Sequence, residues 1–204
     1  MTFSKLSARL LAAADFVRQG SFVADIGSDH AYLPIYLCSL GKIRGALASD
    51  INEGPVARAK INIATYHLGK KISVMRTDGL SGVESFSPDD IVICGMGGEL
   101  IANIISKAEW LKKNKTRLIM QPMTHTEILR EYLYKNGFEI TDEAMVEDSK
   151  IYQITVARYT GKNTEADMLE LKFGKINLQR REDILLYALQ REKEILSARL
   201  AGKQ

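Results

Sequence analysis

The 204-residue sequence contains little cysteine, with Cys38 and Cys94 the only two thiols. Two distant cysteines match neither a disulfide framework nor the closely spaced pairs that bind zinc. His67 and His125 show no metal-ligand spacing either. We therefore expect both thiols to be reduced residues of the core, and we expect no metal site.

Long apolar runs are also absent. A membrane-spanning helix needs roughly 20 apolar residues, and no run in this chain approaches that length. The N-terminus lacks the basic region, apolar run and small-residue cleavage site of a secretory signal. These absences predict a cytoplasmic protein that contacts no membrane.

A strong excess of one charge is missing too, since the formal net charge is only +3. Residues 1–157 hold 18 basic and 18 acidic side chains, whereas residues 158–204 hold 10 basic and 7 acidic ones. A basic C-terminal part favours contact with phosphate, although this excess is small. The basic residues that could contact phosphate are Lys107, Lys112, Lys113, Lys115, Arg117, Lys172, Lys175, Arg180 and Arg181.

Short apolar runs alternate with amphipathic segments over the first 136 residues. The pattern predicts a first helix with apolar residues from Phe3 to Val17. It then predicts strands at 22–26, 45–48, 71–75, 91–94 and 117–120 and helices at 32–40, 55–67, 99–107 and 126–136. Apolar strands without alternation, separated by amphipathic helices, are typical of a parallel sheet covered on both faces.

The pattern changes after residue 136. Two extended segments, 137–145 and 151–159, are separated only by a turn at Asp148-Ser149-Lys150, which predicts a hairpin. A doubly wound, mostly parallel sheet that ends in an antiparallel hairpin is the layout of Rossmann-type class I methyltransferases, whereas dinucleotide dehydrogenases more often complete a second mononucleotide-binding half. This layout favours an α/β methyltransferase domain over residues 1–160, but the topology alone does not decide between the two classes.

Residues 161–204 are predicted to form a short helical tail. Five leucines lie near one stripe and predict a single helix of about six turns, namely Leu178, Leu185, Leu189, Leu196 and Leu200. This helix could pack on the domain or form a short coiled coil. The segment 169–173 is compatible with either an extended piece or a first tail helix, which Gly174 would end.

The clearest functional signal is VADIGSDH (Val23–His30), where the first predicted strand runs into a turn. Ligands of open α/β sheets bind at the carboxyl ends of the strands, and Gly27 would let a ligand approach the backbone closely. A dinucleotide fingerprint would have further glycines where Asp29 and His30 stand. A carboxylate there repels pyrophosphate but suits the ammonium group of a methionine moiety.

Two further strands are followed by a carboxylate. Asp50 ends the second strand and could accept hydrogen bonds from ribose hydroxyls, while Asp78 follows the third and could accept from an adenine amino group. Together with Asp25 on the first strand, they would form an acidic rim. Such a rim predicts a pocket for a sulfonium nucleoside.

The fourth strand ends in a glycine-rich loop, Gly95-Met96-Gly97-Gly98, whose backbone could lie against a flat base or a transferring methyl group. The sequence lacks here the Asn/Asp-Pro-Pro-aromatic pattern with which many methyltransferases hold an exocyclic amine. Its absence favours a ring nitrogen, or another acceptor, as the methylated group.

Three segments, IGSDHAYLP (Ile26–Pro34), ICGMGG (Ile93–Gly98) and Gln121-Pro122, resemble the bacterial tRNA adenine-22 N1-methyltransferase family, TrmK. The likeness runs from about Leu6 to the end of the chain. It implies methyl transfer from S-adenosylmethionine to N1 of an adenine in the D-arm of tRNA. The chain departs from the family at Met123, where Asn is expected, and in a tail shorter than the family's two-helix appendage.

The resemblance also implies residue roles. Adenine N1 already has an in-plane lone pair, so alignment with the methyl carbon and sulfur should supply most of the acceleration. Asp29 is the expected catalytic carboxylate, stabilising the cationic product ring or accepting a proton, unless it binds the methionine ammonium instead. His30 and Tyr32 are expected to position or stack the base. The expected cofactor-binding residues are Asp25, Ile26, Gly27, Ser28, Asp29, His30, Asp50, Ile51, Thr77, Asp78, Gly79, Cys94, Gly95, Met96, Gly97 and Gly98.

Other functions are compatible with the sequence. A methyltransferase could act on another RNA base, a protein or a small molecule. The same scaffold could serve a nicotinamide-dependent oxidoreductase, or a non-catalytic RNA-binding relative. Nothing in the sequence indicates an obligate protein partner.

Overall fold

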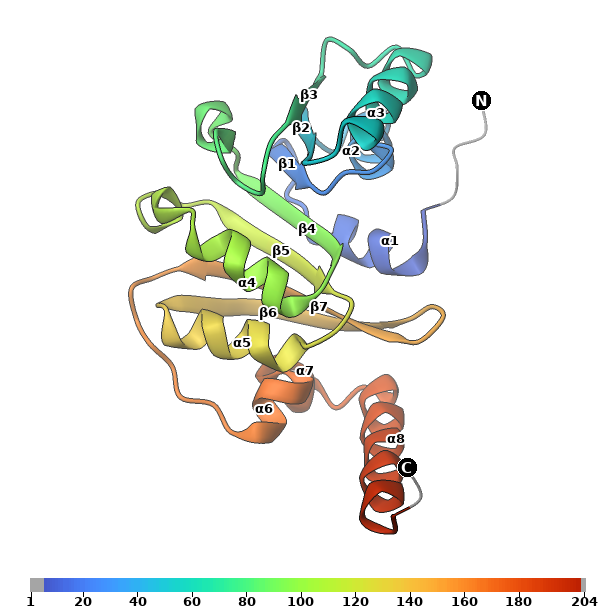
Figure 1. Cartoon of the computed structure of the whole chain (residues 1–204), viewed down its shortest axis with the longest axis vertical. Helices are drawn as coiled ribbons and strands as arrows, with labels where there is room; N and C mark the ends of the chain where they lie inside the picture. Colours follow the sequence, from blue (N-terminus) through green and yellow to red (C-terminus); the bar gives the residue numbers. More distant parts are fainter. Residues whose placement is uncertain (1–5, 203–204) are drawn as a thin grey trace.

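The structure, a computed structural model, describes residues 6–202. The elements follow in the order α1 (Ala8–Asp15), β1 (Phe22–Ile26), α2 (Tyr32–Ser39), β2 (Gly45–Asp50), α3 (Glu53–Thr65), β3 (Ile72–Arg76), η1 (Val83–Phe86), β4 (Asp90–Met96), α4 (Gly98–Ser106), η2 (Glu109–Lys112), β5 (Arg117–Pro122), α5 (Thr126–Lys135), β6 (Phe138–Glu147), β7 (Ile151–Tyr159), α6 (Met168–Phe173), α7 (Lys175–Arg180) and α8 (Asp183–Leu200). Figure 1 shows their arrangement.

The centre of the molecule is one seven-stranded sheet in the order β3-β2-β1-β4-β5-β7-β6. The first five strands of this order are parallel, whereas β7 is antiparallel to both β5 and β6. Helices α1, α2 and α3 pack on one face, and α4 and α5 pack on the other. The predicted fold class, a mostly parallel doubly wound sheet with a terminal antiparallel hairpin, is confirmed.

The predicted elements of the sheet domain agree with the structure to within a few residues at their ends. The first helix begins at Ala8, and the predicted contribution of Phe3 lies outside the described residues. No helix between residues 6 and 202 is both long and apolar enough to cross a membrane.

The prediction of a single helix of about six turns in the tail is wrong, because the structure has two helices there, α7 and α8. Arg181 adopts a left-handed backbone conformation with φ 54°, which ends α7 and separates Leu178 from the leucines of α8. The segment left open before Gly174 is a helix, α6, begun by a capping box between Asp167 and Glu170. Leu185, near the start of α8, packs against Met145 of β6, while the rest of α8 extends away from the sheet in Figure 1.

A fully buried ion pair joins the tail to the sheet domain. Arg130 of α5 donates from Nε to Glu143 Oε1 of β6 at 2.8 Å, and both side chains are inaccessible to solvent. Arg130 also donates to the carbonyls of Leu171 and Lys172, at the end of α6. The other carboxylate oxygen of Glu143 accepts the backbone N–H of Ile176 at 2.9 Å. This pair therefore holds α6 and α7 against α5 and β6.

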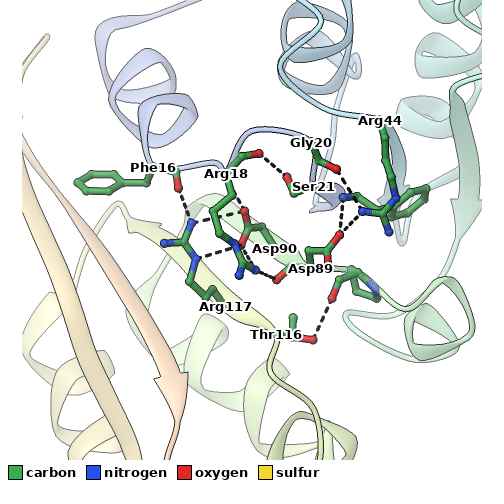
Figure 2. A network of polar contacts seen from close by, with 11 residues as sticks. Phe16, Arg18, Gly20, Ser21, Arg44, Asp89, Asp90, Thr116 and Arg117 are labelled. Carbon is green, nitrogen blue, oxygen red and sulfur yellow. Dashed lines mark hydrogen bonds and ion pairs between the residues drawn. The ribbon is translucent and has the colours of Figure 1, made fainter.

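A second polar network closes the amino edge of the sheet, where β4 and β5 begin (Figure 2). Buried Asp90 accepts from Arg18 at 2.7 Å and from Arg117 at 3.1 Å. Neighbouring Asp89 pairs with Arg44. Arg117 is held by Asp90 at the edge opposite the carboxyl ends, so binding phosphate would require it to leave this pair.

Removing one partner of the buried pair should destabilise the fold strongly. We expect Arg130→Met to lower the free energy of unfolding by about 3–5 kcal/mol, because it leaves the Glu143 carboxylate buried without its counter-ion. Urea denaturation followed by circular dichroism measures the change.

The matched control is Arg158→Met, which breaks a pair between β7 and Glu139 of β6, where both side chains are about half exposed. It should cost less than about 1 kcal/mol. Equal losses in the two variants would show that burial of the pair does not determine its contribution.

Candidate active site at the carboxyl edge of the sheet

A small cavity opens where β1 meets α2. Its volume is about 230 Å³. Among the described residues, those that line it are Arg9, Leu10, Asp25, Gly27, Ser28, Asp29, His30, Ala31, Tyr32, Leu33 and Cys94. Most of the residues expected at the methionine end of a cofactor site therefore share one cavity.

Asp25 forms the acidic floor of this cavity. It is the penultimate residue of β1 rather than the last, and only 7% of it is exposed. Burial raises the pKa of its carboxyl group from 3.8 to about 6, and the nearby Ser28 side chain partly offsets this rise. A buried carboxylate without a charged partner gains most from a ligand that brings a positive charge.

The turn after Asp25 brings bare backbone to the cavity. Gly27 has φ +74°, and a Cβ atom there would lie 2.2 Å from the Met96 Cε atom. The Ser28 N–H donates to the Ser49 carbonyl at 2.8 Å, which ties this turn to β2. The hydroxyls of Ser28 and Ser49 are buried without a hydrogen-bond partner of normal geometry among the described residues. These orphaned hydroxyls and the open backbone fit a polar ligand at this place.

Asp50 is the last residue of β2, as predicted. Its Oδ1 atom accepts the backbone N–H of Asn52 at 2.8 Å, which orients the carboxylate at the start of α3. The following Ile51 is 54% exposed, an unusual position for a large apolar side chain. A carboxylate beside an exposed apolar side chain can bind a ribose and cover one face of its base.

Asp78 and Gly79 do follow β3, but the structure places them in a second cavity, of about 400 Å³. This cavity extends along α4 to Ile104, Lys107 and Trp110. Neither residue lines the cavity of Asp25. Asp25, Asp50 and Asp78 therefore do lie at or just after the ends of three strands. Asp78, however, lines a different cavity from Asp25.

Glycine is required at two positions near the end of β4, for two different reasons. Gly95, with φ +84°, needs a left-handed conformation next to the cavity. Gly98 instead lies against the turn before α5, because a Cβ atom there would come within 2.1 Å of the His125 carbonyl oxygen. Cys94 lines the cavity, where loss of hydration, followed by the charge of Asp25, raises the pKa of its thiol well above the usual range. Gly98 therefore has a packing reason that is independent of any ligand.

Asp29, His30 and Tyr32 form the outer wall of the cavity. Asp29 is exposed, accepts from Arg58 at 2.5 Å and lies 3.4 Å from the His30 ring. The rings of His30 and Tyr32 are stacked, with centroids 4.9 Å apart and planes 9° from parallel. Asn62 holds the loop through the His30 carbonyl at 3.0 Å. An exposed carboxylate beside an aromatic pair can accept and orient a planar base.

Comparison with known proteins shows the family to which the chain belongs. The family described as a methyltransferase domain matches residues 6–155. The tRNA (adenine(22)-N(1))-methyltransferase of Bacillus subtilis is 40% identical over 173 residues, which is 84% of this chain and 73% of that protein. The chain belongs to the tRNA (adenine-22 N1)-methyltransferase family.

Solved structures agree with that assignment. A Streptococcus pneumoniae protein in complex with S-adenosyl-L-methionine is 35% identical, with a TM-score of 0.86 over 93% of this chain and 88% of that one. TrmK of M. capricolum, in complex with S-adenosylhomocysteine, is 30% identical, with a TM-score of 0.83 over 98% of this chain and 88% of that one.

Two residues of this tRNA methyltransferase site were missed or misread from sequence. Arg9 of α1 lines the cavity, although nothing in its local pattern marks it. Gln121, named from sequence only as part of the family motif, is fully buried and accepts a hydrogen bond from Arg9 at 2.9 Å. Only the spatial contact between α1 and β5, more than a hundred residues apart, reveals this pair.

Several basic residues proposed for tRNA are already paired. Lys172 pairs with Glu192, and Arg180 pairs with Asp142 at 2.6 Å. Lys112 pairs with Glu109 at 2.8 Å. Binding phosphate would require these side chains to exchange partners, which lowers the net gain from each.

The raised pKa of Asp25 makes a pH-dependent prediction. In the folded protein the carboxyl holds its proton more tightly than in the unfolded chain, so its ionisation costs stability above about pH 6 and costs nothing below about pH 4. Asp25→Asn should remove a cost of up to about 3 kcal/mol at pH 8.

The free energy of unfolding of both proteins is measured by urea denaturation at pH 8 and at pH 4. All other carboxyl groups are the same in the two proteins, so their titration cancels in the comparison. The stability of Asp25→Asn relative to wild type should be greater at pH 8 than at pH 4. A difference independent of pH would contradict the assigned shift.

Proposed function

We propose that this protein transfers the methyl group of S-adenosylmethionine to N1 of adenine 22 in the D-arm of tRNA. The observation that carries the proposal is the cavity at the end of β1, whose acidic floor and wall come from Asp25 and Asp29. It lies in a chain that shares 40% identity with a tRNA (adenine(22)-N(1))-methyltransferase over most of its length.

The residues at this edge fit the donor group by group. The ionised Asp25 carboxyl suits the α-ammonium, and the unpartnered hydroxyl of Ser28 can hydrogen-bond to the amino-acid part. Gly27 lines the cavity with its backbone, and the space beside Gly95 is open, since a Cβ atom there would meet nothing closer than Arg9 Nη1 at 3.7 Å. Asp50 and Ile51 suit the ribose and base, and we propose that Asp78, in the second cavity, contacts the adenine amino group. The remaining proposed contacts are Ile26, His30, Thr77, Gly79, Cys94, Met96, Gly97 and Gly98.

The protein's own task is then orientation and charge stabilisation. When bound, the cofactor supplies an electrophilic methyl group on a sulfonium ion. Adenine N1 needs no deprotonation, so Asp29 has no proton to remove before attack. Its carboxylate, fixed by Arg58 and beside His30, stabilises the positive charge that develops on the adenine ring. The stacked Tyr32 and His30 rings orient the extruded base.

We also propose how the chain is divided and where it works. Residues 1–160 would carry the chemistry and residues 161–204 the RNA contacts, with the buried Arg130–Glu143 pair between them. Because tRNA is the proposed substrate, the cytoplasm is the proposed location. Methylation of another RNA base or of a small molecule is the alternative outcome of the assay below.

The activity assay uses the full chain, unmodified tRNA and tritiated S-adenosylmethionine. We expect label in tRNA and a reverse-transcription stop at position 22, because N1-methyladenine blocks base pairing. The matched control is the same tRNA with guanine at position 22, which should take up no label. Equal labelling of both tRNAs would contradict the proposed target.

Asp29 and Asp50 should respond differently to substitution. Asp29→Asn should lower kcat by about 10²-fold while changing cofactor affinity little, because its carboxylate acts on the transition state. Asp50→Asn should mainly weaken S-adenosylhomocysteine, by about tenfold, through lost ribose hydrogen bonds. Single-turnover rates and calorimetric affinities separate the two effects. A loss of affinity in Asp29→Asn equal to its loss of rate would assign this residue to cofactor binding.

A further inference from the structure

The cavity that follows β3 is larger than the cavity of Asp25, and the proposed cofactor contacts account for only part of it. Its volume is about 400 Å³, against about 230 Å³ for the cavity of Asp25, and the two have no described lining residue in common. Sites for small ligands have volumes of roughly 300–1,000 Å³. Beyond Asp78 and Gly79, the cavity is lined by Leu80, Ser81, Glu84, Ile104, Lys107 and Trp110. It therefore has room for a second ligand.

An apolar base and a flat aromatic ring shape this cavity. A Cβ atom on Gly79 would lie 3.1 Å from the Ile104 Cγ2 atom, so the loop after β3 lies close against α4. Leu80 and Ile104 are buried at the contact. Trp110 of η2, the single tryptophan of the chain, is partly buried against the same core and lines the cavity with its remaining surface. An indole ring in this position offers a planar ligand a surface on which to stack.

The charged groups of this part of the cavity have no partner within the described residues. The side chains of Glu84 and Lys107 form no hydrogen bond or ion pair there, and the indole N–H of Trp110 has no acceptor. By contrast, Lys112, two positions after Trp110, pairs with Glu109 at 2.8 Å. A ligand can therefore bind to Glu84 and Lys107 without displacing an existing contact.

Trp110 also lies within a basic segment. Residues 107–115 contain four lysines and one glutamate, so this segment alone has a net charge of +3, equal to that of the whole chain. An aromatic ring among lysines is typical of proteins that bind single-stranded nucleic acid, because bases stack on the ring while phosphates contact the cations. Lys113 and Lys115 are exposed and continue the positive surface beyond Lys107.

We propose that this cavity binds one unpaired nucleotide of the tRNA substrate, outside the catalytic site, with its base stacked on Trp110 and its phosphate on Lys107. The inference rests on the proposed function, because tRNA supplies the nucleotide. The Glu84 carboxylate accepts a hydrogen bond from an exocyclic amino group, which favours adenine, cytosine or guanine over uracil. An organic cation fits the cavity less well, because Lys107 would repel it.

The first test uses the fluorescence of Trp110, which reports stacking directly because the chain has no other tryptophan. Unmodified tRNA, added to protein saturated with S-adenosylhomocysteine, should quench the emission, and AMP should do so only at much higher concentrations. S-adenosylhomocysteine alone should leave the emission unchanged. Equal quenching by S-adenosylhomocysteine would assign the cavity to the cofactor, and quenching by AMP without any by tRNA would assign it to a free nucleotide. Either result overturns the inference.

The second test measures tRNA affinity by filter binding. Trp110→Leu should weaken tRNA binding by about 5- to 100-fold, as expected for the loss of one stacked base, and Trp110→Phe should restore part of it. Calorimetry should give both variants the wild-type affinity for S-adenosylhomocysteine, which also reports correct folding. Lys107→Met, at an exposed position, should reduce the slope of log K against log salt concentration by about 1, because one phosphate contact is lost.

The matched control is Lys60→Met, which removes an exposed lysine from α3, on the other face of the sheet. It should leave both the tRNA affinity and the salt slope unchanged. The inference is overturned if tRNA does not quench Trp110, or if Lys107→Met changes the slope no more than Lys60→Met does. Wild type that is quenched by tRNA but transfers no methyl group to it would support this inference and contradict the proposed function.

Discussion

The parallel pairing of β1 with β2 and β4 is the constraint on which the rest of the site depends. It places Asp25 opposite Ala48 and Val92, so that the loops after these three strands leave the sheet at one edge. Loops that leave together can meet around one ligand, and no side chain needs to travel far to reach it. The hydrogen bond from the Ser28 N–H to the Ser49 carbonyl then ties the loop after β1 to β2.

The buried carboxylates at the two edges of the sheet differ in whether a cation pairs with them. At the amino edge, Asp90 is buried with two arginines beside it, and its charge is compensated within the fold. At the carboxyl edge, Asp25 is buried with no cation pairing it among the described residues, and its pKa rises to about 6. The fold thus compensates the carboxylate of Asp90 and leaves that of Asp25, in the proposed site, uncompensated, which lowers stability where a ligand with a positive charge could restore it.

Local sequence patterns predicted the sheet domain well, because most of its parallel strands are short apolar runs, and glycine or aspartate stands at or just after the ends of β1, β2 and β4. They could not show that Asp78 faces a different cavity from Asp25, since a shared edge does not fix which way a loop turns. The break at Arg181 was missed because a left-handed arginine leaves no composition signal. The position of Arg9 at the cavity was missed because it depends on contact with Gln121, 112 positions away along the chain.

The central claim is that the loops after β1, β2 and β4 bind one sulfonium nucleoside. Amide hydrogen exchange of the full chain, with and without S-adenosylhomocysteine, tests it most directly. The account predicts increased protection at residues 25–30, 50–52 and 94–98. Protection confined to another region, such as the cavity between α5 and residues 163–166, would contradict it.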